Sequence, residues 1–143
     1  MTPFTAVYDA FLSRILEDEW QHWMMEEAEQ DWRQIMANAL SWFKFPRVSL
    51  EYNEEGFLGD LSNEEIQIIA DFMKCEWFNR CIMTWENIKP LYEERDFSQA
   101  NLLDKLNSLY EAQEKKARER EAIYYRSRNG KPFDFTKLAG GSQ

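Results

Sequence analysis

Residues 62–88 read SNEEIQIIADFMKCEWFNRCIMTWENI, and this stretch decides the fold of the chain. Ser62 and Glu65 match the Ser-x-x-Glu capping box, in which each side chain accepts a hydrogen bond from the other residue's backbone N–H, so a helix should begin here. Apolar residues then recur at helical spacing along two stripes, one of Ile66, Ile69, Ala70, Met73 and Trp77 and one of Ile68, Phe72, Ile82 and Trp85. A helix with two apolar stripes is expected at the centre of a bundle, and Pro90 should end it.

Two further helices are expected before this central one. The first should open with Thr2 as its cap and Pro3 at the first helical position, where an N–H has no helical partner in any case, and it should end or bend around Glu17-Asp18-Glu19. Its apolar residues at helical spacing are Phe4, Val7, Tyr8, Phe11, Leu12 and Ile15. The second should span residues 26–43, because acidic residues occupy its first turns, where the helix dipole favours them, and Phe45-Pro46 stops it. Its apolar face would hold Trp32, Ile35, Met36, Ala39, Leu40 and Phe43.

The rest of the chain adds a minor element and one long helix. Residues 47–61 alternate weakly between apolar and polar around Asn53-Glu54-Glu55-Gly56, which indicates a small β-hairpin or an irregular loop. A last helix should start near Asp96 or Ser98. Its segment 111–120 is non-polar only at two alanines, so we expect this segment to project from the body. The apolar residues of the helix come earlier, at Leu102, Leu103, Leu106, Leu109 and Tyr110.

These patterns predict an all-α fold. Residues 1–128 should form a bundle of about four helices with a minor β-hairpin or loop, and residues 129–143 an extended C-terminal docking arm. The length of 143 residues suits one domain, and 15% aromatic residues is too apolar for a disordered chain. No stretch approaches the roughly 18 apolar residues of a membrane span, and the first residues lack a secretory signal pattern. We therefore expect no membrane partner, and the two cysteines fit a reducing compartment.

Charge is divided unevenly along the chain. Residues 1–114 hold nine basic and 23 acidic residues, a net charge of −14, whereas residues 115–143 hold eight basic and three acidic residues, a net charge of +5. The two parts sum to the net charge of −9 of the whole chain. A cationic segment on an acidic body is typical of an interaction tail.

The candidate binding residues lie in this cationic part. Phe133 and Phe135 take alternate positions of the expected arm, and no further element follows to fold over them. We expect the arm to dock into a groove or sheet edge of another chain, and folding back on its own bundle is the alternative. The residues expected in the docking contact are Tyr124, Tyr125, Arg126, Arg128, Lys131, Phe133, Phe135, Lys137 and Leu138.

The candidate catalytic and metal-ligating residues do not combine into a site. His22 is the only histidine, and its carboxylate neighbours are more typical of a solvated helix surface than of a metal centre. Cys75 and Cys81 lie about 240° apart around one helix, which suits small core residues better than shared ligands. The acidic run at residues 26–31 lacks the Glu-x-x-His pairs of a di-iron bundle. Without a glycine-rich phosphate loop or a nucleophile motif, we expect no enzyme, no cofactor and no metal.

Two surfaces have more than one interpretation. The basic stretch from Lys115 to Arg128 allows contact with nucleic acid, but the acidic body opposes such binding, and a charged solvated helix is the alternative. The apolar group Trp20, Trp23, Met24 and Met25 belongs either to the core or to a contact with a neighbouring copy.

Three short segments in this order, Phe45-Pro46-Arg47, Glu64-Glu65-Ile66 and Ser98-Gln99-Ala100-Asn101-Leu102, resemble a family of small tailed-bacteriophage virion proteins, the head–tail connector or neck adaptor proteins. The resemblance spans roughly residues 4–128, and Lys131–Leu138 departs from the family's ending. It implies a helical subunit of a ring of about twelve copies that links the portal to the tail and lines the DNA conduit. The implied partners are the portal protein, neighbouring copies and a tail or second neck protein. DNA would pass without specific binding, and the chain would reach the virion neck from the host cytoplasm.

Other roles stay open at this point. The chain could be a tail completion or terminator protein of the same virion. It could instead be a soluble regulatory adaptor that binds a host protein through the basic arm, in which case it would be absent from virions. For an enzyme, no catalytic set can be named.

Overall fold

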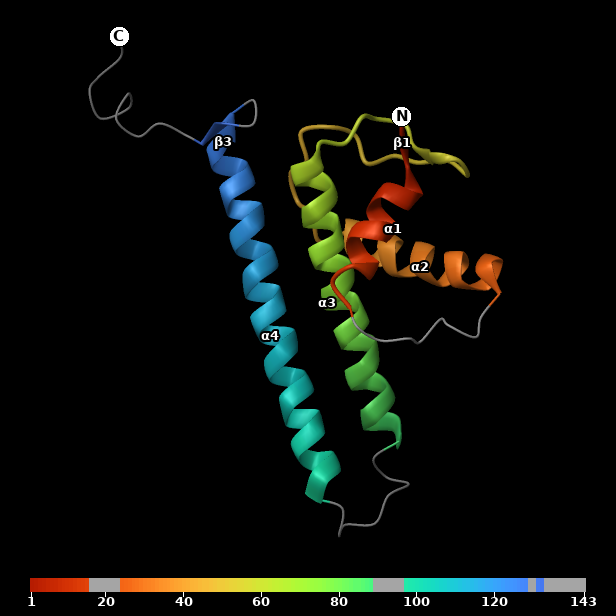
Figure 1. Ribbon diagram of the computed structural model, residues 1–143. Coiled ribbons are helices and arrows are strands. Elements are labelled where there is room, and N and C mark those ends of the chain that lie inside the picture. Colours follow the sequence, from red (N-terminus) through yellow and green to blue (C-terminus); the bar gives the residue numbers. More distant parts are fainter. Residues whose placement is uncertain (16–23, 89–96, 129–130, 133–143) are drawn as a thin grey trace, which may run out of the picture.

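The computed structural model describes residues 1–15, 24–88, 97–128 and 131–132 (Figure 1). These residues form four helices: α1 (Phe4–Leu12), α2 (Met25–Leu40), α3 (Asn63–Ile88) and α4 (Phe97–Arg126). Two short antiparallel strand pairs accompany them, β1 (Thr2–Pro3) with β2 (Gly56–Phe57) and β3 (Ser127–Arg128) with β4 (Lys131–Pro132). The predicted all-α class with about four helices and a minor hairpin is confirmed.

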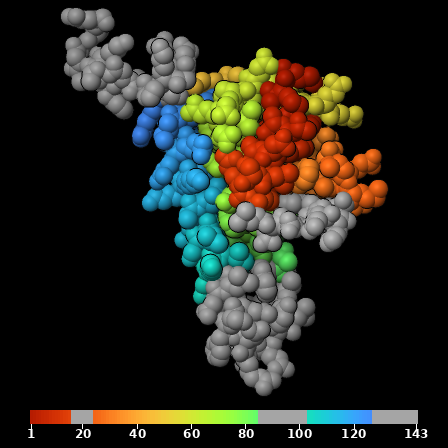
Figure 2. All heavy atoms as spheres, in the orientation of Figure 1, coloured from red at the N-terminus to blue at the C-terminus, as the bar shows by residue number. Residues whose placement is uncertain are grey.

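Helix α3 is the centre of the bundle and contacts α1, α2 and α4. Figure 2 shows α1 (red) lying across one face of the molecule, between α4 (blue) and α2 (orange). The predicted capping box forms, because the Ser62 N–H donates to Glu65 Oε1 at 2.8 Å and the Glu65 N–H donates to Ser62 Oγ at 3.2 Å. The fully buried side chains of α3 include Ile68, Ile69, Ala70, Phe72 and Met73. The central position predicted from the two apolar stripes is therefore confirmed.

The start of α1 is fixed by a strand pair rather than by a side-chain cap. Thr2 Oγ1 donates to the Gly59 carbonyl at 3.0 Å and accepts a hydrogen bond from the Leu61 N–H at 2.8 Å. The prediction that Thr2 caps the helix is therefore wrong, and Pro3 takes the N-cap position in an extended conformation. A Cβ atom at Gly56 would lie 2.4 Å from the Thr2 carbonyl oxygen, so only glycine fits opposite β1.

The hairpin predicted within residues 47–61 is present in a minimal form. Asn53 Oδ1 accepts hydrogen bonds from the N–H groups of Glu55 at 2.8 Å and Gly56 at 3.1 Å, which closes the turn. Tyr52 and Phe57 then pair across it. Because Phe57 also pairs with β1, the hairpin ties the first residues of the chain to the segment that leads into α3.

Helices α1 and α2 are both shorter than predicted. α1 ends at Leu12, before the predicted end or bend around residues 17–19, and α2 ends at Leu40 rather than at Phe43. Ile15 and Phe43 are nevertheless buried. The apolar pattern correctly predicted that these two side chains are buried in the core, although each residue lies beyond the end of its helix.

Helix α4 does not project from the body over residues 111–120, and that prediction is wrong. Gln113, Ala117 and Glu121 are buried, at 6%, 0% and 4% exposed. Their spacing of four residues places them on one helix face, which packs against α3. The Gln113 side chain donates from Nε2 to the Asp71 carbonyl oxygen at 3.2 Å. The segment has few apolar residues because its buried face is largely polar and hydrogen-bonded.

A buried carboxylate joins α1, α3 and α4. Asp71 of α3 has no exposed surface, and its Oδ1 atom lies 2.9 Å from Nε of Arg14, which follows α1. Its Oδ2 atom lies 2.6 Å from Nε of Arg120 on α4. Burying one carboxylate is costly unless cations pair with it, so this arrangement fixes both arginines beside α3.

Several residues of the sequence analysis lie outside the described residues, namely Trp20, His22, Trp23 and Pro90. Met24 and Met25, at the start of α2, are 68% and 66% exposed, so they do not belong to the core of this chain. Within the described ranges, no helix combines the length and the apolar character needed to cross a membrane.

Packing of α4 on α3 can be tested at its small buried residue. Ala117→Leu should destabilise the protein by about 1–3 kcal/mol, because added methylene groups have no space at a fully buried position. Ala112→Leu is the matched control, since Ala112 is exposed on the same helix and leucine is nearly as good a helix former as alanine. Urea unfolding of both variants measures the difference, and equal stabilities would contradict the packed arrangement.

Candidate partner-binding surface

The segment between α2 and β2 is fastened to the last turns of α4. Residues 41–47 follow α2 without regular structure, so their backbone N–H groups need other partners. Three of these groups donate to α4 side chains: Lys44 to Glu121 Oε2 at 3.3 Å, Phe45 to the Tyr125 hydroxyl at 3.0 Å, and Arg47 to the Tyr124 hydroxyl at 2.7 Å. Residues far apart in the sequence are thereby held together at one end of the bundle.

Tyr124 holds this junction together from the inside. It is only 1% exposed, and its hydroxyl donates to Glu65 Oε2 at 2.8 Å. The Arg47 guanidinium lies 4.1 Å from the centre of the Tyr124 ring and donates to the Tyr124 carbonyl oxygen. Burial raises the pKa of Tyr124 to about 12, and its hydrogen bond to Glu65 acts in the same direction. The predicted docking role of Tyr124 therefore needs correction, because the ring is enclosed by its own chain.

Two of the basic side chains in the stretch 115–128 likewise make hydrogen bonds or ion pairs within the molecule. Arg118 donates to the Trp42 carbonyl at 3.0 Å and to Glu121 at 2.9 Å, and its guanidinium lies 5.0 Å from the centre of the Phe72 ring. Arg120 is paired with the buried Asp71 carboxylate. Two of the six basic residues that suggested a solvated or nucleic-acid-binding helix thus stabilise the bundle.

Outside this junction lies an aromatic and basic surface. Phe45 is 71% exposed and Tyr125 is 40% exposed, and their ring centroids are 5.9 Å apart in an edge-to-face arrangement. The exposed residues Lys44 and Arg126 are their sequence neighbours. We call these four residues the Phe45–Tyr125 patch. Exposed aromatic side chains flanked by cations are the residue types that anchor protein–protein interfaces.

The strand pair β3–β4 continues directly from this patch. Arg128 pairs with Lys131 in its register, so two cationic residues stand directly opposite each other. The connecting sequence is Asn129-Gly130, which is the dipeptide most typical of a two-residue hairpin connection. This strand pair was not predicted from the sequence.

The structure thus separates the predicted docking residues into three groups. Tyr125 and Arg126 lie at the surface, Arg128 and Lys131 lie in the β3–β4 pair, and Tyr124 is buried. Phe133, Phe135, Lys137 and Leu138 lie outside the described residues. Lys44 and Phe45 were not among the residues predicted to bind a partner. The dipeptide Phe45-Pro46 indicates that Phe45 is exposed. A residue before proline favours an extended conformation, so Phe45 does not continue the buried face of the preceding helix.

The two cysteines both lie on α3, six residues apart, and Cys75 is buried. Burial raises the pKa of Cys75 to about 12, so its thiol stays protonated and unreactive near neutral pH. Cys81 is partly buried on the same helix. Among the described residues, no group of three or more His, Cys, Asp or Glu side chains could hold a metal ion.

The role assigned to Tyr124 can be tested against its neighbour. Tyr124→Phe should destabilise the protein by about 1–3 kcal/mol, because it leaves the buried Glu65 carboxylate and the Arg47 N–H without the hydroxyl. Tyr125→Phe, the matched control, removes a hydroxyl at a more exposed position and should cost less. Chemical denaturation of the two variants measures the difference, and an equal or reversed order would contradict the assignment.

Comparisons with known proteins do not assign the chain to a family. No family model matches it, and neither the curated proteins nor the solved structures contain a significant match. The resemblance to phage neck proteins stays a prediction from the sequence.

Proposed function

We propose that this chain is a non-catalytic structural subunit of a tailed-bacteriophage neck, a head–tail connector that forms a ring and links the portal to the tail. The observation that carries this proposal is the Phe45–Tyr125 patch, an aromatic and basic surface on a helical bundle whose overall charge is negative. The family resemblance supplies the virion setting. The contacts around the patch supply a way to bind a protein partner.

The patch is suited to a protein interface because it is both exposed and held in place. The Phe45 N–H donates to the Tyr125 hydroxyl at 3.0 Å, and Tyr124, the neighbour of Tyr125, is fixed in the core. Aromatic side chains that are already ordered lose little conformational entropy when a partner covers them. A partner surface with an apolar recess would gain most from this arrangement.

The partner should also present acidic groups. The positive charge of the chain is concentrated at its C-terminal end, because residues 115–143 carry a net charge of +5. Carboxylates on the partner would complement this charge. We therefore expect the portal surface that faces this end of the chain to be acidic.

The charge of the remaining chain suits a position beside passing DNA. Residues 1–114 carry a net charge of −14, and an acidic surface does not retain the phosphate backbone. Of the four basic residues at positions 115–120, Lys115 and Lys116 are exposed, whereas Arg118 and Arg120 pair with Glu121 and Asp71. Half of the positive charge of this segment is thus paired within the bundle and does not contribute to holding DNA.

Incorporation into particles tests the proposal. Phe45→Asp should abolish incorporation, because it places a carboxylate at the centre of the docking patch, while folding should be unchanged at a position that is 71% exposed. Leu109→Asp is the matched control, since Leu109 is an exposed apolar residue at 42% on another part of α4. Quantitative mass spectrometry of purified particles gives the copy number of each variant relative to the portal.

Each outcome of this experiment has a definite meaning. Wild-type chain in particles, with Phe45→Asp excluded and the control retained, supports the neck role. Normal incorporation of Phe45→Asp would contradict docking through the patch. Absence of the wild-type chain from particles would favour the regulatory adaptor, and its recovery with isolated tails alone would favour a tail completion protein.

Binding to duplex DNA provides a second test. The isolated protein should not bind duplex DNA at physiological salt, where charges are screened beyond about 8 Å and the acidic body dominates. Lys115→Glu combined with Lys116→Glu should leave this behaviour unchanged and preserve the fold, because both side chains are exposed. Fluorescence anisotropy at several salt concentrations measures binding. Tight, salt-dependent binding that this double variant abolishes would contradict the conduit role.

A further inference from the structure

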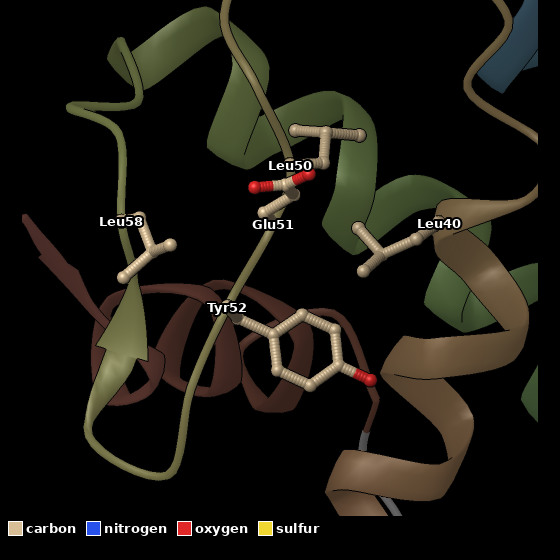
Figure 3. A pocket seen from close by; sticks show the side chains of 5 residues that line it. All are labelled: Leu40, Leu50, Glu51, Tyr52 and Leu58. Atoms are coloured by element: carbon tan, nitrogen blue, oxygen red, sulfur yellow. The ribbon is translucent and has the colours of Figure 1, made fainter.

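A shallow apolar groove lies beside the hairpin of residues 47–61 (Figure 3). Its volume is about 520 Å³, and it is lined by Leu40, Leu50, Glu51, Tyr52 and Leu58. Leu58 is 52% exposed and Tyr52 is 39% exposed, so apolar surface remains open to solvent. Figure 3 shows Leu40 at the end of α2 facing the segment that carries Leu50 and Tyr52.

The border of this groove is acidic. Glu51 belongs to the lining, and Glu54 and Glu55 are exposed in the turn that follows Tyr52, where the Arg33 side chain donates to the Glu54 carbonyl oxygen. A ligand that combines apolar side chains with cations would therefore match both the interior and the rim.

The same chain contains a segment with this composition. From Lys131 to Leu138 the sequence reads KPFDFTKL, with Phe133 and Phe135 at alternate positions and a lysine on each side of the pair. In an extended segment, alternate side chains point to the same face, so both rings could enter one groove together. Lys131 and Lys137 would then lie near the acidic rim.

We propose that the groove lined by Leu40, Leu50, Tyr52 and Leu58 binds the Lys131–Leu138 segment of a second copy of this chain. The inference rests on the proposed function, because it supplies the contact between neighbouring subunits of a ring. Figure 1 shows β3, which precedes this segment, on one side of α3 and the β1–β2 pair, which borders the groove, on the other. Because β3 and the groove lie on different sides of α3, such a contact between two copies would be head-to-tail, and head-to-tail contacts build rings when the rotation closes.

Self-association of the 143-residue chain tests the inference. Sedimentation velocity at increasing concentration should show self-association, because the contact is small and binds weakly in isolation. Leu58→Asp in the groove, or Phe133→Ser with Phe135→Ser in the segment, should each weaken association about tenfold or more, the usual loss for an anchoring side chain. Leu109→Asp should associate like the wild-type chain, since Leu109 is exposed but lies outside the groove. A thermal melt of each variant confirms that it is folded.

Mixing the two defective variants gives a sharper result. A groove variant still has an intact segment, and a segment variant still has an intact groove, so the pair can form one contact with each other. At a concentration where each variant alone is monomeric, the mixture should therefore produce dimers and no larger species. Only a head-to-tail contact between these two surfaces gives this pattern.

Three results would overturn the inference: a mixture that stays monomeric, a Leu58→Asp variant that associates normally, or a wild-type chain that is monomeric at every concentration. If the wild-type chain is monomeric and the groove variant and the segment variant are both less stable than it by the same amount, the segment occupies the groove of its own chain. The outcome is independent of the particle experiment. If Phe45→Asp is not incorporated and the chain shows no head-to-tail association, the neck role is supported and this contact is rejected. If Phe45→Asp is incorporated normally and head-to-tail association is observed, this contact is supported and docking through the Phe45–Tyr125 patch is rejected.

Discussion

The arrangement of the bundle depends on one buried carboxylate. Asp71 lies without exposed surface on α3, where Arg14 pairs with one of its oxygens and Arg120 with the other. A buried carboxylate is costly unless both arginines pair with it. The Asp71 carboxylate therefore fixes α1 and α4 relative to α3. The hydrophobic core supplies most of the driving force for folding, but α4 offers it few apolar side chains. The ionic and hydrogen-bonded contacts therefore decide where α4 lies.

The position of α4 in turn creates the candidate binding surface. Side chains in its last turns accept hydrogen bonds from backbone N–H groups of residues 41–47. Tyr124 is buried there, and Tyr125 remains at the surface beside Phe45. An irregular segment without these hydrogen bonds would have no defined conformation. The proposed docking surface is thus a consequence of how α4 closes on α3.

The sequence was informative where burial followed a simple period. The capping box at Ser62 and the two apolar stripes of α3 correctly predicted a central helix, and the turn at Asn53 was correctly located. The buried face of α4 could not be recognised, because Gln113 and Glu121 resemble solvated residues until their partners are known. Tyr124 was placed in the docking contact for the same reason, since adjacent tyrosines are equivalent in sequence but face opposite environments. Phe45 was overlooked because its exposure depends on a contact with a residue 80 positions away.

Hydrogen exchange along α4 tests the central claim most directly. If α4 is packed on α3 through a buried polar face, the amides around residues 113–124 should exchange nearly as slowly as those of the α3 core around residues 68–73. Both groups should then become exposed in the same opening reaction. Exchange of the α4 amides at the rate of a solvated helix, with the α3 core still protected, would contradict the account and restore a projecting helix.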